Sequence, residues 1–252
     1  MRKLLVIISI LLLVLGALGA STVFAAGATW SVVSVDTIGC AGSATTFSMV
    51  LAGVTDPSPY FWRTIVADRR DTWEGYEQPD RPADADLVAW YRSGLADTVA
   101  VLGAVDPAQS NWTWSTDKSA AFVIRRMAQE TAIHRWDAEQ AAGLDTGVEP
   151  HLASDGIDEF LMWFADEPKE GAPAPGGSVH LHCGDVPGEW TVRLNAEGTF
   201  DIERAHAKGD CALRGSASDL LLALWRRRPA SSIDVVGDAD VAARFLAYPA
   251  LE

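Results

Sequence analysis

The stretch from Ser119 to Gly143 constrains the fold most strongly, because its polarity repeats with the period of one long amphipathic helix. Successive residues of a helix turn by about 100°. On that projection, one stripe carries small or apolar side chains, namely Val123, Ile124, Met127, Thr131, Ala138 and Ala141. The opposite face is expected to carry Arg125, Gln129, Trp136 and Gln140. Glu130 and His134 fall inside the first stripe, one turn apart, where an unpaired charge would be expensive.

This Glu–His pair has two interpretations. A bundle helix that buries Glu and His at positions i and i+4 offers two ligands to a metal ion. The same spacing also occurs where a carboxylate orients a core histidine, and the spacing alone favours that simpler arrangement. The flanking sequence favours the metal.

Five strings of the sequence, of which the first contains this pair, resemble those of a known family and occur in the same order. They are FVIRRMAQETAIHRWDAEQAAG from Phe122, HLASDGIDEFL from His151, SVHLHCGD from Ser178, GEWTVRL from Gly188 and HAKGDCALRGSASDLLLALWRRRP from His206. From about Asp84 to the C-terminus the chain resembles the mycothiol-dependent maleylpyruvate isomerase family, whereas the first third shows no such similarity. The resemblance implies an α+β protein, in which a DinB-like metal-binding helical bundle precedes a sterol-carrier-like α/β domain.

The resemblance also implies a metal site. A His of an earlier bundle helix would bind a divalent metal together with a Glu and a His of the last helix, and these last two positions match Glu130 and His134. The third ligand is missing, because the chain has no His before His134. The implied metal is zinc and the implied thiol cofactor is mycothiol, whose thiolate adds to a maleyl-type double bond and is eliminated after rotation. We therefore expect an impaired isomerase or thiol transferase.

Further candidate site residues lie near the C-terminus. Arg227 matches best an arginine that would bind a carboxylate of the substrate or of the thiol cofactor, so it is a candidate for catalysis and for cofactor binding. The basic run around it also suits the solvated end of a helix. His206 precedes a Lys-Gly-Asp turn and is a second candidate for cofactor binding. His180 and His182 share one face of a strand, either as two ligands or, as is more common, as polar side chains of a half-buried strand.

The chain begins with a pattern typical of export. The basic residues of Met1 to Lys3 precede the apolar run from Leu4 to Ala20, and small residues around Ala25 suit cleavage of a signal peptide. The run is long for a signal peptide and short for a membrane span, so an uncleaved anchor stays an alternative. Both alternatives predict an exported or membrane-anchored chain, which we favour over the cytoplasmic location that the family implies.

Four segments follow from these patterns. They are a signal or anchor (1–26), a short strand-rich segment of unknown role (27–68), a partial helical bundle with the metal-ligand motif (69–147) and the C-terminal α/β domain (148–252). Phe61 to Val66 is a candidate strand, and the chain up to about residue 68 is expected to pack poorly and to add nothing to the site. A helix from Asp84 to about Val105 would pair with the long helix as half of a bundle. Alternation after Ser178 predicts an antiparallel sheet with helices on one face.

Composition narrows the partners and the functions. The formal net charge of −14 argues against nucleic acid and anionic membrane surfaces. The partners that the resemblance implies are a small thiol and a small carboxylate substrate, with a homodimer as an open alternative and membrane contact only through an uncleaved N-terminal segment. Three cysteines, odd in number and far apart, predict neither a disulfide scaffold nor a cysteine-rich zinc site. Two functions stay open, a metal- and thiol-dependent isomerase or transferase and a catalytically inactive exported fusion that binds an apolar ligand or a protein.

Overall fold

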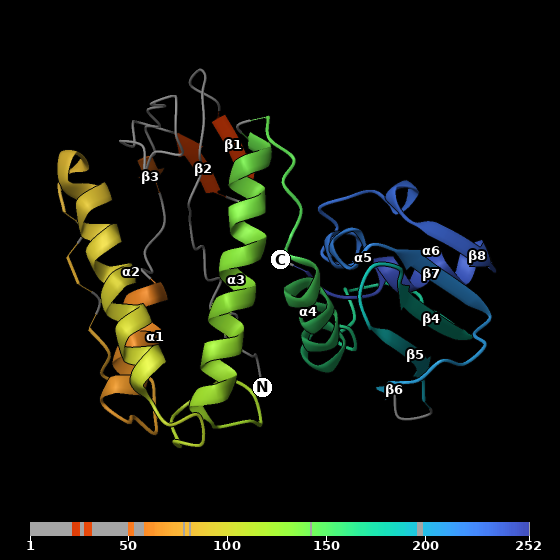
Figure 1. Cartoon of the computed structure of the whole chain (residues 1–252), viewed down its shortest axis with the longest axis horizontal. Helices are drawn as coiled ribbons and strands as arrows, with labels where there is room; N and C mark the ends of the chain where they lie inside the picture. The colour runs from red at the N-terminus through yellow and green to blue at the C-terminus, as the bar shows by residue number, and fades with distance from the viewer. Residues whose placement is uncertain are drawn as a thin grey trace. The chain divides into compact units, whose positions relative to one another are not determined.

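The computed structural model describes residues 22–25, 28–31, 50–52, 58–77, 79–80, 82–141, 143–195 and 199–251. The chain separates into two compact units, with the boundary between Thr146 and Gly147 (Figure 1). The apolar run from Leu4 to Ala20 lies outside the described residues. Within the described residues, no helix is both long and apolar enough to cross a membrane.

Three short strands come first among the described residues. They are β1 (Thr22–Ala25), β2 (Ala28–Ser31) and β3 (Val50–Ala52), which pair antiparallel in the order β1-β2-β3. The strand-rich character expected for residues 27–68 therefore extends, among the described residues, only as far as Ala52.

The next element corrects the sequence prediction. Residues 61–66, expected as a strand, lie in helix α1 (Ser58–Ala67). After Tyr60, the side chains that α1 buries follow the helical period rather than the alternation of a strand, namely Phe61, Trp62, Ile65 and Val66. A short apolar run does not distinguish the two periods, so packing against the neighbouring helices decides between them.

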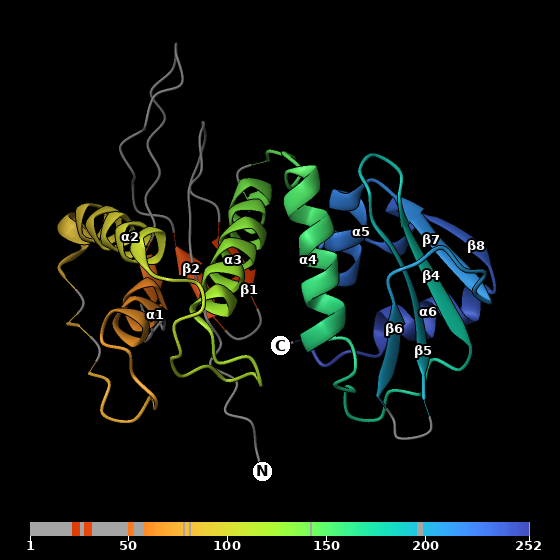
Figure 2. The same ribbon diagram turned by 60° about the horizontal axis from the view of Figure 1, so that its bottom comes forward.

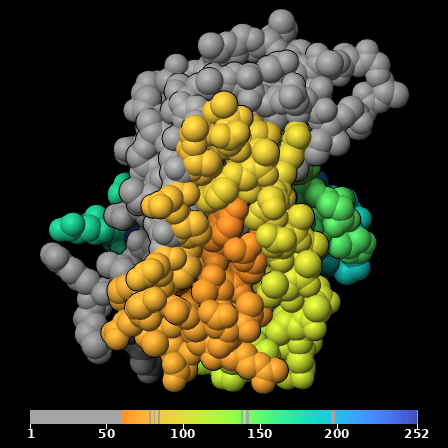
Figure 3. Space-filling model, turned by 90° about the vertical axis from the view of Figure 1, so that its left-hand side faces the viewer, coloured from red at the N-terminus to blue at the C-terminus, as the bar shows by residue number. Residues whose placement is uncertain are grey.

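Helix α1 packs on α2 (Leu87–Ala104) and also contacts α3 (Ala120–Ala141). The rings of Tyr60 and Trp90 stack with their centroids 4.6 Å apart, and the Tyr60 hydroxyl donates to the Trp90 carbonyl over 3.0 Å. A Cβ atom at Gly94 would lie 2.4 Å from the Tyr60 ring, so this approach requires glycine. In Figure 3 the orange and yellow atoms of α1, α2 and their connection form one continuous surface. The expectation of poor packing up to residue 68 is therefore wrong for α1.

The two long helices begin and end close to the predicted positions, but the buried face of α3 is different. Helix α2 follows a 3-10 turn at Asp84–Asp86. In α3, Gln129 and Trp136 were expected on the open face and are buried, whereas Thr131 is exposed. Val123 and Met127 of the predicted stripe are buried as expected, but the buried face turns toward the larger apolar area of Phe122, Ile133 and Trp136.

The second unit is built on a five-stranded sheet, whose strands lie side by side in one layer in Figure 2. The strands are β4 (Ser178–Cys183), β5 (Glu189–Leu194), β6 (Phe200–Glu203), β7 (Cys211–Gly215) and β8 (Asp234–Gly237). Their order is β6-β5-β4-β7-β8, and β4 and β7 are parallel. The expectation of an antiparallel sheet is therefore wrong for this pair. The physical reason is that the chain forms the meander β4-β5-β6 and then crosses back to place β7 on the other side of β4.

Three helices accompany this sheet, α4 (Pro150–Trp163), α5 (Ala217–Leu224) and α6 (Ala239–Ala247). Helix α4 packs on α5, and both α5 and α6 contact β4 and β7. Alternate residues of β4 point into the core beneath them, namely Val179, Leu181 and Cys183. The other face of β4 carries His180 and His182.

Candidate functional site

The predicted ligand pair of α3 is held in a chain of ionic contacts on one helix. The Oε2 atom of Glu130 lies 3.1 Å from Nε2 of His134, and the side chains are 15% and 25% exposed. The guanidinium of Arg126 contacts the other carboxylate oxygen, Oε1. Nδ1 of His134 lies 3.0 Å from the Asp137 carboxylate. Spacings of three and four residues place all four side chains along one edge of the helix.

These contacts set the charges of the pair. Burial raises the pKa of Glu130, but the charge of Arg126 and the contacts with His134 outweigh it and lower the pKa to about 2. Burial lowers the pKa of His134, but the carboxylates of Asp137 and Glu130 outweigh it and raise the pKa to about 9. At neutral pH the pair therefore consists of a carboxylate and an imidazolium, and a metal would have to displace a proton from His134.

The α3 pair fits a metal only in part. Oε2 and Nε2 converge as two ligands of one ion would, and Asp137 occupies the position of a carboxylate that orients a metal-bound imidazole. Catalytic zinc sites, however, use three protein ligands. Within the described residues, no third His, Cys, Asp or Glu joins this pair to make a group of three ligands. Glu130 and His134 alone therefore do not complete a zinc site, and their role as ligands stays a prediction.

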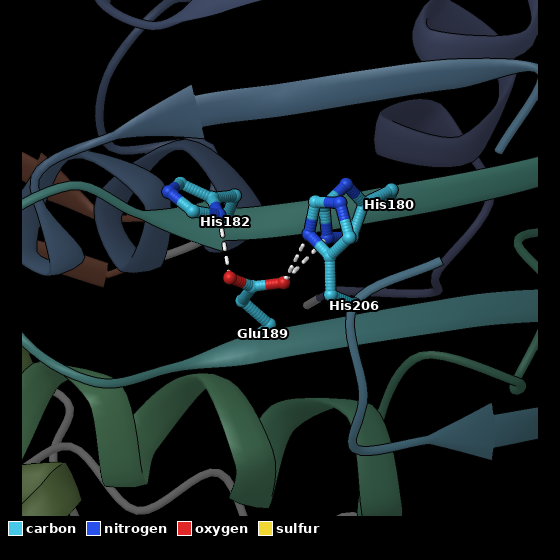
Figure 4. A group of neighbouring side chains, drawn as sticks. All are labelled: His180, His182, Glu189 and His206. Atoms are coloured by element: carbon cyan, nitrogen blue, oxygen red, sulfur yellow. Dashed lines mark hydrogen bonds and ion pairs between the residues drawn. The ribbon is translucent and has the colours of Figure 1, made fainter. Parts of the chain in front are cut away.

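A more complete group of ligand atoms lies on the sheet of the second unit. It consists of His180, His182, Glu189 and His206, and we call it the sheet cluster (Figure 4). One ligand atom from each residue lies within 4.8 Å of the others. Glu189 occupies the centre, where its Oε2 atom lies 3.2 Å from Nε2 of His180 and 2.7 Å from Nδ1 of His206. Its Oε1 atom lies 3.0 Å from Nδ1 of His182.

Strand pairing and one loop build the sheet cluster. In the antiparallel β4–β5 pair, His182 lies directly opposite Glu189. His180 lies two residues back on the same face of β4. His206 comes from the connection between β6 and β7, which we call the crossover loop (204–210). The loop contacts the face of the sheet at Thr191, whose hydroxyl donates to the Ala205 carbonyl over 3.4 Å.

The structure corrects the expectation of a solvated histidine face. The side chain of His180 is only 4% exposed and that of His182 is 34% exposed. The imidazoles of His180 and His206 meet edge to face, with their centroids 5.0 Å apart. Sequence reasoning missed Glu189, although the alternation of β5 places it on the face opposite to buried Trp190 and Val192.

The arginine run after α5 separates into different roles. Arg226 donates to the carbonyls of Leu246, Ala247 and Pro249 over 2.6 to 3.0 Å, so it stabilises the C-terminal end of α6. Arg228 forms an ion pair with Asp219. Arg227 donates to the Trp225 carbonyl over 3.0 Å, and its guanidinium lies 5.8 Å from the centroid of the Trp225 ring. No contact in this group tests a role of Arg227 in binding a carboxylate.

Two family models match the chain. Residues 41–139 match the mycothiol maleylpyruvate isomerase N-terminal domain, and residues 151–244 match the MDMPI C-terminal domain. The first match begins well before residue 84, so it includes α1. No curated protein and no solved structure matches the chain.

Proposed function

Since the chain belongs to the mycothiol maleylpyruvate isomerase family, we propose that it is a mycothiol-dependent isomerase or thiol transferase of low activity. Its partners would be a small thiol and a small carboxylate with an activated cis double bond. The observation that carries the proposal is the convergence of Glu130 Oε2 and His134 Nε2, 3.1 Å apart, on the helix that the family match includes.

The low activity follows from the incomplete ligand set. The family implies a divalent metal, which we expect to be zinc, but two protein ligands leave two or more positions to water. Loss of a ligand should weaken binding strongly, because losses of residues that merely orient ligands already cost about 10–100-fold. Arg126 adds a positive charge beside Glu130, which opposes a cation further. We therefore expect weak metal binding at this pair and correspondingly slow turnover.

We assign to Arg227 the binding of a carboxylate on the substrate or on the thiol. A guanidinium binds a carboxylate through two parallel hydrogen bonds, a geometry that lysine does not reproduce. The assignment rests on the place of Arg227 after Leu-Trp-Arg, which matches the family's arginine best, whereas its two neighbours hold α5 and α6. Arg227→Lys should therefore raise KM for the carboxylate more than it lowers kcat.

The test is isomerisation of maleylpyruvate with mycothiol, with and without added zinc. We expect slow turnover that Glu130→Gln and His134→Gln each abolish, while His151→Ala, a change of an exposed histidine on α4, leaves it unchanged. Insertion of a His-bearing helix before α1 should raise the rate more than any change in the second unit. Fast zinc-dependent turnover by the unmodified chain would contradict the assignment of an incomplete site.

No turnover in any of these assays would favour the second function, an exported binding module without catalysis. Export itself is proposed from the Met1 to Ala25 pattern. Fractionation of cells that express the full chain, with an antibody against the second unit, would test it. Recovery in the cytoplasm at full length would contradict export.

A further inference from the structure

We propose that the sheet cluster is a metal site of the closed, four-ligand type, which binds one zinc-like divalent ion and fastens the crossover loop to the sheet. This inference does not depend on the proposed catalytic function. It rests on the donor atoms, on one buried nitrogen and on the backbone that positions both.

The donor set suits a transition metal. Three imidazoles and one carboxylate are typical zinc ligands, whereas calcium and magnesium prefer oxygen ligands throughout. Bonds of about 2.0–2.1 Å in a tetrahedron separate neighbouring ligand atoms by about 3.3 Å. The contacts of Glu189 Oε2 with His180 and His206 and of Oε1 with His182, between 2.7 and 3.2 Å, are already at or below this separation. The widest separation in the group, within 4.8 Å, requires only side-chain adjustment.

One nitrogen distinguishes this group from a simple hydrogen-bonded network. Nδ1 of His182 is buried and has no hydrogen-bond partner, although it lies 3.0 Å from Oε1 of Glu189. Leaving a buried polar atom without a hydrogen bond costs about 1–3 kcal/mol. A metal between the two atoms would satisfy the nitrogen lone pair and the carboxylate together.

The charges around Glu189 differ from those at the α3 pair. Within the described residues, its ion-pair partners are the three imidazoles, whereas Glu130 also contacts a guanidinium. A bound divalent ion would hold all three imidazoles in the neutral form that ligation requires.

The backbone fixes the loop that supplies His206. The N–H and the hydroxyl of Ser178 both donate to Oδ2 of Asp210, over 2.7 and 2.8 Å, and the Asp210 N–H donates back to the Ser178 carbonyl over 2.9 Å. A Cβ atom at Gly209 would lie 3.0 Å from the backbone nitrogen of His180. The loop therefore approaches β4 as closely as a glycine allows, and His206 is placed beside His180.

Four protein ligands leave no open position, so the site is structural rather than catalytic. His206 is 71% exposed and lies on a loop between two strands, so the ion would connect the crossover loop to β4 and β5. The expected consequences are metal-dependent stability of the second unit and protection of the crossover loop from proteolysis.

The test uses the full chain without a polyhistidine tag, in a Glu130→Gln/His134→Gln background that removes the other ligand pair. We expect one equivalent of zinc after dialysis, a higher Tm with zinc than with EDTA, and the intense visible absorption of tetrahedral cobalt(II) after substitution. His206→Ala should weaken zinc binding more than tenfold and remove the cobalt absorption. His151→Ala is the matched control and should change neither. Because the His206 side chain is exposed, its truncation should leave the fold intact, which circular dichroism would verify.

Three results would each contradict the proposal of a metal site at the sheet cluster. They are no zinc bound in this background, affinity unchanged by both His206→Ala and Glu189→Gln, and an octahedral cobalt spectrum. If the background variant does not fold, the substitutions are compared in the unmodified chain instead. There, His206→Ala should remove the tetrahedral cobalt(II) spectrum, whereas His134→Gln should leave it in place. Failure of zinc binding here would leave the isomerase proposal untouched, since that assay depends on Glu130, His134 and Arg227.

Discussion

Raising the pH should destabilise the first unit through His134. The contacts with Asp137 and Glu130 raise the pKa of this imidazole from its ordinary value of 6.5 to about 9. The protonated form is therefore more stable in the folded chain than in the unfolded chain. The contribution of this protonated imidazole to the free energy of unfolding is fully present below about pH 6.5 and is lost as the pH rises through 9.

The magnitude follows from the size of this shift. One pKa unit corresponds to about 1.36 kcal/mol, so the full shift corresponds to about 3 kcal/mol. The side chain is 25% exposed, so solvent reduces this value, and we expect a loss of about 2–3 kcal/mol between pH 6 and pH 10. That is a large fraction of the stability of a typical domain.

The assay is denaturant unfolding at several pH values in the presence of EDTA, followed by tryptophan fluorescence. Six tryptophans lie among the described side chains of the first unit, so its unfolding dominates the signal, namely Trp62, Trp73, Trp90, Trp112, Trp114 and Trp136. His134→Gln should remove most of the loss above pH 7, and Asp137→Asn should move its midpoint to lower pH. His151→Ala should behave as the unmodified chain. A pH dependence that is the same with and without His134 would refute the reasoning.

Two further predictions concern packing and thiol chemistry. Gly94→Ala should cost about 1–3 kcal/mol of unfolding free energy, because the added Cβ meets an aromatic ring at 2.4 Å. Gly103→Ala lies on the same helix with open space around the Cβ position, so it should instead stabilise the chain by about 0.5–1 kcal/mol. Equal effects of the two changes would contradict the packing of Tyr60 against Gly94. Burial raises the pKa of the Cys183 and Cys211 thiols to about 11, so in a Cys40→Ser background both should react slowly with a thiol reagent at pH 8 and rapidly once denatured. Fast reaction of the native chain would show that the sheet core opens readily.

The sequence by itself determined the features that depend on local periodicity. The bounds of the long helix from Ser119 to Gly143 were predicted to within two residues, because a helix of this length repeats its pattern many times. The alternation in Ser178 to Cys183 likewise predicted a strand with both histidines on one face. Family membership followed from several strings that agree in order, and the two family matches confirm it.

Only the tertiary structure decided which faces and which distant segments come together. Residues 61–66 carry a pattern too short to distinguish helix from strand, and packing on α2 and α3 makes them a helix. Glu189 joins His182 because of the register between two strands, and His206 reaches His180 because the chain crosses back over the sheet before β7. Neither contact has a local periodic signal, since register and crossover depend on pairing between residues far apart in sequence. The Glu–His pair of α3 was therefore found from one helix alone, whereas the sheet cluster required the fold.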